Sequence, residues 1–241
     1  MKNTHRIDKV LSNMGYGTRR EIKNMIKKGR VRIGGGVIKD NGIHVNPYED
    51  QIEVDGKQLS YKEVIYIMMN KPQGVISASF DPKVDTVVTL LDQKDQIFHP
   101  FPVGRLDKDT EGLLILTNDG KLAHELLSPK KHVPKTYFAR IDGKVETEDI
   151  IRFHEGVVLD DGYKTMPAQL KIIESGEISE IELTIYEGKF HQVKRMFQSV
   201  GKKVIYLKRI KMGNLSLDPL LRTGEYREVT QEELKALKGE A

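Results

Sequence analysis

Residues 104–120 read GRLDKDTEGLLILTNDG, a short polar loop that runs straight into an apolar segment. The apolar residues 113–116 have to be buried, so they give the preceding loop a rigid support. The loop presents Asp107 close to Arg105, a side chain that can bind a phosphate. Together with a basic N-terminal segment, this pattern favours a carboxylate that acts on RNA. For Asp107 taken alone, a surface turn is the commoner structure, since Asp is frequent in loops.

The composition sets wide bounds on the fold and excludes several kinds of site. A chain of 241 residues is long enough for one large domain or two modest ones. It has no Cys, which excludes disulfides, a thiolate nucleophile and a zinc–thiolate site. Residues 64–69 form the longest apolar run, which is too short to cross a bilayer, and residues 1–6 lack the apolar core of a signal peptide. We therefore expect a soluble, cytoplasmic protein with no membrane partner.

Positive charge is concentrated in two regions of the sequence. Residues 1–62 carry 13 Lys and Arg against 7 Asp and Glu, a net charge of +6, whereas residues 63–241 carry 26 against 28, a net charge of −2. Residues 188–211 contain eight basic residues and no acid. Scattered lysines usually form a solvated face, but two separate basic clusters favour a polyanionic partner.

Two short helices are predicted near the N-terminus. The first has apolar residues at helical spacing, namely Ile7, Val10, Leu11 and Met14. Thr18 and Glu21 have the spacing of a capping box for the second helix, which we expect to end near Gly29. Short strands at residues 31–33 and 37–38, and a hairpin over residues 52–59, are predicted to follow.

This arrangement resembles the S4 RNA-binding domain over residues 4–62. The motif residues are Arg6, Asp8-Lys9-Val10-Leu11, Arg19-Arg20-Glu21 and Gly29-Arg30-Val31. The resemblance implies contacts between RNA phosphates and basic side chains, which are Arg19, Arg20, Lys23, Lys27, Lys28, Arg30 and Arg32. Phosphate contacts give affinity and register but read little sequence. A domain of residues 1–62 is therefore predicted, and by itself it would make the protein a binder and not an enzyme.

The rest of the chain predicts an α+β domain over residues 63–241. Strands are predicted at residues 64–69, 135–141, 180–186 and 203–207, and helices begin after Asp119 and at Thr147. A third helix is predicted from the apolar stripe Phe190, Val193, Phe197 and Val200. Because strands are not regularly separated by helices, we expect a mixed, mainly antiparallel sheet flanked by helices.

Residues 63–241 resemble the RsuA-type branch of the RNA pseudouridine synthases, in which an N-terminal S4 domain is typical. The sequence contains none of the usual motifs for a phosphate-binding loop, a metal-binding pair of His or the nucleophile elbow of a hydrolase. The matching motifs, in chain order, are Met69-Asn70-Lys71-Pro72-Gln73-Gly74, Gly104-Arg105-Leu106-Asp107, Gly112-Leu113-Leu114, Thr117-Asn118-Asp119-Gly120, Lys135-Thr136-Tyr137, Glu187-Gly188-Lys189-Phe190-His191-Gln192-Val193-Lys194-Arg195-Met196-Phe197, Val200-Gly201 and Gly224-Glu225-Tyr226-Arg227.

The resemblance implies an isomerase that converts a uridine of ribosomal RNA to pseudouridine without a cofactor or a metal. Asp107 matches the essential aspartate, and its first step is open: attack on the sugar, attack on the base, or removal of a ribose proton. Tyr137 matches the aromatic residue that stacks on the target base, and Lys194 matches the cation paired with the aspartate, where many relatives have Arg. Arg105 matches a residue that supports the flipped nucleotide, and Leu207 matches an apolar wall of the pocket.

The residue patterns alone also allow other roles for this site. Tyr137 would ordinarily be a core or surface residue of a strand, and Lys194 a solvated residue of a helix. Asp109 and Glu111 could form a set of carboxylates with Asp107, but a solvated acidic turn explains these two better.

The motif at residues 191–197 and the later Gly224-Glu225-Tyr226-Arg227 resemble the small-subunit branch of the family. We therefore predict 16S ribosomal RNA, free or in an assembly intermediate, as the partner of a monomeric enzyme. A large-subunit ribosomal RNA is the alternative within this class. A non-catalytic S4-domain ribosome-assembly factor is the alternative from another class, although such a protein would be expected to lose Asp107 or its partner.

Overall fold

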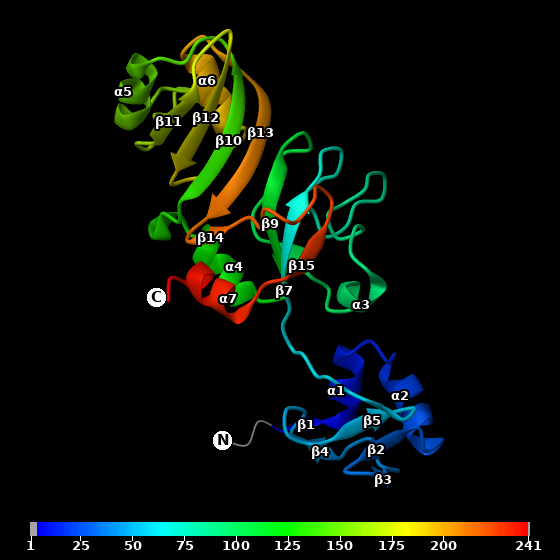
Figure 1. Ribbon diagram of the computed structural model, residues 1–241. Coiled ribbons are helices and arrows are strands. Elements are labelled where there is room, and N and C mark those ends of the chain that lie inside the picture. The colour runs from blue at the N-terminus through cyan, green and yellow to red at the C-terminus, as the bar shows by residue number, and fades with distance from the viewer. Residues whose placement is uncertain (1–3, 241) are drawn as a thin grey trace. The chain divides into compact units, whose positions relative to one another are not determined.

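The computed structural model describes residues 4–240, which divide into two compact units (Figure 1). The first comprises the chain up to Ile65 together with Asp92–Pro100, and the second comprises Tyr66–Leu91 and the chain from Phe101 onward. No helix in residues 4–240 combines the length and the apolar content that a membrane span requires. The predicted domain boundaries, residues 1–62 and 63–241, stay a prediction.

The first unit is built on two helices, α1 (Ile7–Asn13) and α2 (Arg19–Lys27). The predicted capping box begins α2: Thr18 accepts a hydrogen bond from the Glu21 backbone N–H, and the Glu21 carboxylate accepts one from Thr18 N–H. Apolar faces of both helices pack into one core with strand residues; the helix residues in it are Ile7, Val10, Leu11, Ile22, Met25 and Ile26. The helices predicted from apolar spacing are thus confirmed.

Short strands cover this core. A four-stranded sheet has the order β3-β2-β5-β6, formed by β2 (Val31–Ile33), β3 (Gly36–Val37), β5 (Ile52–Val54) and β6 (Lys57–Gln58). Two further strands, β1 (His5–Arg6) and β4 (His44–Val45), pair with each other. The predicted hairpin of β5 and β6 turns at Asp55 and Gly56, both of which have a positive φ. The short helix α3 (Gln93–Gln96) belongs to this unit.

Within the described residues, the second unit contains one nine-stranded sheet. Its main path runs β11-β12-β10-β13-β9-β7-β15, while β8 and β14 pair at the side. The strands are β7 (Tyr66–Lys71), β8 (Phe101–Pro102), β9 (Glu111–Thr117), β10 (Lys135–Asp142), β11 (Gln169–Glu174), β12 (Ile178–Ile185), β13 (Lys203–Met212), β14 (Leu215–Ser216) and β15 (Tyr226–Glu228). The pairs are antiparallel except β13 with β9, so the predicted mixed, mainly antiparallel sheet is confirmed.

The parallel contact between β9 and β13 depends on a glycine. Gly112 has a φ of +103°, and a Cβ atom at this position would lie 2.2 Å from the carbonyl oxygen of Arg209. Lys71 of β7 pairs with Gly112 on its other side. The backbones of three strands therefore meet at a position that only glycine occupies without strain.

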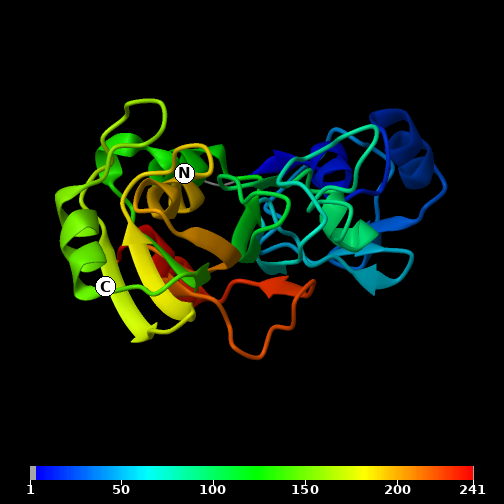
Figure 2. The ribbon, with the colours of Figure 1, turned by 90° about the horizontal axis from the view of Figure 1, so that it is seen from above.

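Helices flank this sheet at several places. Figure 1 shows α5 (Thr147–Glu155) beside β11 and α6 (Gln192–Ser199) near β13, in agreement with their contacts. The helices α4 (Gly120–Leu127) and α7 (Gln231–Lys238) share an apolar core with β14. Asp119 begins α4, as predicted, by accepting hydrogen bonds from two backbone N–H groups of its first turn. Figure 2 shows the loop before β15, in orange-red, projecting from the sheet, where Leu220 is exposed.

The start of α6 differs from the prediction. Phe190 was expected on the buried stripe of this helix, but the helix begins only at Gln192 and the Phe190 side chain is 73% exposed. The physical reason is a local turn: the Gln192 side chain accepts a hydrogen bond from Lys189 N–H, and His191 takes the left-handed conformation with φ of +48°. These interactions hold Phe190 outside the helix, while Val193 and Phe197 are buried as predicted.

Candidate active site

The loop between β8 and β9 carries Asp107 on a backbone that is itself hydrogen-bonded. Thr110 N–H donates to the carbonyl oxygen of Asp107 at 3.0 Å, and Gly74 N–H donates to that of Lys108 at 2.8 Å. The buried strand β9 begins directly afterwards. The Asp107 side chain is 30% exposed, so it reaches solvent from a fixed backbone.

A fully buried lysine lies beneath this loop. The ammonium group of Lys71 donates to the carbonyl oxygens of Pro72 at 2.9 Å, Thr110 at 3.0 Å and Asp107 at 3.1 Å. Burial lowers the pKa of Lys71 to about 8, an effect that nearby carboxylates oppose. All three N–H donors thus have an acceptor, and two of these acceptors belong to the loop that carries Asp107.

Helix α6 places a second cation against Asp107. The Lys194 ammonium nitrogen is 3.3 Å from Asp107 Oδ2 and 2.6 Å from Asp109 Oδ1. His191 Nε2 lies 3.7 Å from the same oxygen of Asp107. The bond to Lys194 holds the pKa of Asp109 below its usual range. The Lys194 ammonium group thus pairs with both carboxylates, and a carboxylate beside a cation can serve as a base or a nucleophile.

A cavity of about 80 Å³ opens beside Asp107. Tyr137 from β10 and Leu207 from β13, both nearly buried, line it together with the exposed Arg105. Its remaining lining residues are Leu106, Thr110, Ile185, Gly188, Lys189, His191, Gln192 and Val193. The fold therefore brings Asp107, Arg105, Tyr137 and Leu207 to one cavity, with Lys194 bonded to the carboxylate. A cavity that combines polar and charged groups with the apolar surfaces of Tyr137 and Leu207 suits a flat, partly polar ligand.

Acidic residues from distant segments face the second basic cluster. Arg195 bonds Asp160 and Asp161, and Lys202 bonds Asp149. Arg209 is 2% exposed and donates to the carbonyl oxygen of Leu113. The run of basic residues 188–211 is therefore not one free cationic surface, contrary to what its sequence indicates.

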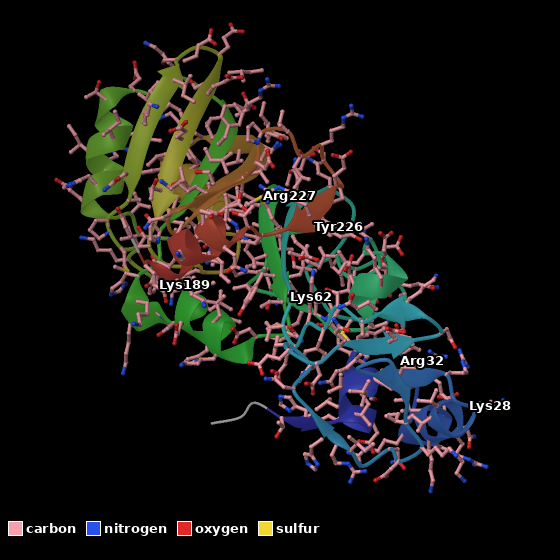
Figure 3. The ribbon with its side chains drawn as sticks, turned by 60° about the horizontal axis from the view of Figure 1, so that its bottom comes forward. Lys28, Arg32, Lys62, Lys189, Tyr226 and Arg227 are labelled. Carbon is pink, nitrogen blue, oxygen red and sulfur yellow. The ribbon has the colours of Figure 1, made fainter. Side chains whose placement is uncertain are left out.

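The basic residues predicted to contact RNA in the first unit are all exposed: Arg19, Arg20, Lys23, Lys27, Lys28, Arg30 and Arg32. Lys28, which follows α2, and Arg32 on β2 are labelled in Figure 3. Arg30 also forms an ion pair with Asp55, with Nε 2.7 Å from Oδ1. Six of the seven have no ion pair among the interactions of the described residues. Arg30 would have to bind an RNA phosphate while it is paired with Asp55.

One residue of the site, Lys71, was not identified from the sequence. Lys71 could have been noticed as a charge at the end of an otherwise apolar run, directly before Pro72. Asp109 is 68% exposed, in agreement with its predicted place in a solvated turn, and it also bonds Lys194. Glu111 was expected in the same turn, but it begins β9 and accepts a hydrogen bond from the Tyr206 hydroxyl at 2.7 Å. Within residues 4–240, no three His, Cys, Asp or Glu side chains gather as a metal site would require.

The sequence matches two family models: RNA pseudouridylate synthase over residues 65–199 and the S4 domain over residues 5–52. An uncharacterized RNA pseudouridine synthase of Bacillus subtilis, YtzG, is 54% identical, with 96% of this chain and 98% of that protein covered. Ribosomal large subunit pseudouridine synthase B of B. subtilis is 41% identical, covering 97% and 95%. Ribosomal small subunit pseudouridine synthase A of Yersinia pestis is 38% identical, covering 96% and 97%.

The structure is also similar to a solved one. A pseudouridylate synthase known from its crystal structure is 36% identical, with a TM-score of 0.68, and the match covers 96% of this chain and 99% of that chain. The predicted fold class, an S4 domain followed by a pseudouridine synthase fold, is confirmed. The chain therefore belongs to the RNA pseudouridine synthase family, and it is an RNA-modifying isomerase with an N-terminal S4 domain.

Proposed function

We propose that this isomerase converts a uridine of small-subunit ribosomal RNA to pseudouridine, with Asp107 as the catalytic carboxylate. The observation that carries the proposal is the pairing of Asp107 with Lys194 beside a cavity lined by Tyr137 and Leu207. In the overall reaction the bond from C1′ of ribose to N1 of uracil breaks and a bond from C1′ to C5 forms. A proton leaves C5 and N1 gains one, so the reaction needs no oxidant or reductant.

Each lining residue then has a distinct role. Lys194 pairs with the Asp107 carboxylate, Tyr137 packs against the uracil ring, and Leu207 forms an apolar wall. Arg105, which is exposed beside the cavity, supports the flipped nucleotide or its phosphate. A uridine inside an RNA helix has to leave the stack first, at a cost of roughly a few kcal/mol.

The small-subunit RNA is proposed on the motif at residues 191–197 and the Gly224-Glu225-Tyr226-Arg227 sequence. Relatives named small subunit pseudouridine synthase A cover almost the whole chain, which supports this substrate. The large-subunit RNA is the second candidate, because a relative named large subunit pseudouridine synthase B is 41% identical. We expect the enzyme to act as a cytoplasmic monomer, with phosphate contacts from the exposed basic residues of the first unit.

The catalytic role of Asp107 is tested by Asp107→Asn, which keeps the shape of the side chain and removes its charge. We expect pseudouridine formation to be abolished and RNA binding to change little, because the proposed phosphate contacts lie elsewhere. Asp142→Asn, at an exposed position on β10, is the matched control and should stay fully active. Normal turnover by the Asp107→Asn enzyme would overturn the assignment.

The choice of RNA is tested with unmodified 16S and 23S transcripts and with the matching subunit assembly intermediates. We expect pseudouridine at one position of the small-subunit RNA, and the same position should remain uridine in cells that lack the gene. A new pseudouridine in 23S RNA alone would establish the large-subunit candidate instead.

A further inference from the structure

The Phe190 ring is exposed to solvent beside the cavity. Its side chain is 73% exposed, and its ring stacks on the imidazole of His191, with ring centroids 3.8 Å apart and planes inclined by 18°. The imidazole covers one face of the phenyl ring and leaves the other face accessible. Single exposed apolar side chains are common and need no explanation. Phe190 differs from such residues in two respects: hydrogen bonds hold the loop that carries it, and it lies next to the cavity.

The loop that carries Phe190 is fixed by hydrogen bonds. The Gln192 side chain accepts from Lys189 N–H at 2.8 Å and donates to the Glu187 carboxylate at 2.9 Å. Glu187 also accepts from the Tyr163 hydroxyl at 2.6 Å. The Lys189 ammonium group lies over the Tyr163 ring, 4.4 Å from its centre (Lys189 is labelled in Figure 3). A ligand that stacks on Phe190 would therefore meet a preorganised surface and lose little affinity to ordering it.

The stack adjoins the catalytic carboxylate. His191 lines the cavity, and its Nε2 atom is 3.7 Å from Asp107 Oδ2, so one side chain separates the Phe190 ring from Asp107. Tyr137, which is 8% exposed, lies inside the cavity, where the target base is proposed to bind. A base on the outer face of Phe190 would be outside that cavity and would belong to a different nucleotide.

We propose that the stack of Phe190 on His191 is a second base-binding site, which takes a nucleobase adjacent to the target uridine. The proposal rests on the assignment of the Asp107 cavity to the target uridine. Flipping a base out of a helix removes the stacking partner of its neighbour. An aromatic face at this position replaces that partner and accepts any base, because every base has a π face.

A fluorescence experiment tests the stacking directly. The chain contains no Trp, so Phe190→Trp in the full-length enzyme introduces one fluorophore at the stack. We expect unmodified 16S or 23S transcript to quench this emission at the concentrations at which filter binding saturates. Ile151→Trp, at an exposed position on α5, is the control and should be quenched much less. Emission from Trp at position 190 that does not change at saturating RNA would overturn the proposal.

Kinetics distinguish stacking from a purely structural role. Phe190→Ala should raise KM roughly 5- to 100-fold, which corresponds to the usual contribution of one stacked base. The kcat should change less than threefold, and Phe190→Tyr should restore KM. Equal KM values for Phe190→Ala and wild type would contradict the proposal. If Trp at position 190 is quenched while the wild type forms no pseudouridine on either RNA, the proposed substrate fails and the base-binding site stands.

Discussion

Among single residues, Lys71 combines complete burial with a charge, and this combination gives a signature in the pH dependence of stability. Its pKa is about 8 in the folded protein and about 10.4 in an unfolded chain. Between these values the unfolded state holds more protons at this site, so raising the pH favours the folded state. Below about pH 8, Lys71 is protonated in both the folded and the unfolded state, so it adds no slope to the pH dependence of the unfolding free energy.

We therefore expect the free energy of unfolding of the wild type to rise with pH relative to Lys71→Met between pH 8 and 10.4. The slope of this difference should be positive and at most about 1.4 kcal/mol per pH unit. Urea unfolding of both proteins at several pH values measures it. Lys121→Met, at an exposed position, should keep the pH dependence of the wild type. A difference between wild type and Lys71→Met that is independent of pH would contradict the expected titration.

Among the elements, the junction of β9 with β13 leaves no room for even one added methyl group. Gly112→Ala would force a Cβ atom against the backbone of Arg209 and strain a residue with φ of +103°. We expect this substitution to destabilise the protein by roughly 3 kcal/mol or more. Gly120→Ala, where a Cβ atom meets nothing within 4 Å, should stay within about 0.5 kcal/mol of the wild type. Equal urea midpoints for the two variants would show that β9 and β13 can separate without cost.

Elements with a regular apolar spacing could be predicted from the sequence, because their burial repeats along the chain. Helix α1 and the strand β12 are of this kind. The start of α6 could not be predicted: Phe190 fits the apolar stripe, but the bonds of Gln192 close a turn before the helix begins. Spacing carries no information on side-chain bonds of this kind, nor on the acids that face Arg195 and Lys202 from distant segments.

The site was predicted through motifs and not through geometry. Asp107 and Lys194 are 87 positions apart, and nothing in their local sequences indicates that they meet. Lys71 was missed because a lysine after an apolar strand ordinarily points to solvent. Its burial becomes evident only when β7, β9 and the loop of Asp107 are placed together.

For the molecule as a whole, RNA binding should depend on charges of the first unit. Reversing Arg19, Arg20 and Lys23 to Glu should weaken RNA binding and reduce the slope of log K against log salt by roughly two to three units. Filter binding at several salt concentrations measures both. The control reverses Lys121, Lys235 and Lys238 of α4 and α7, which changes the net charge equally. Unchanged affinity of the first variant would refute phosphate binding by α2.

The hydrogen bonds under the Asp107 loop also bear on how the enzyme loses activity on heating. Loops that carry functional residues usually open at a small fraction of the global unfolding free energy. Here Gly74 and Thr110 donate backbone N–H groups to the loop, and Lys71 donates from below. Deuterium exchange at these two amides should therefore be as slow as in β9. Catalysis and tertiary structure should then disappear at one temperature, with no range in which a folded enzyme is inactive.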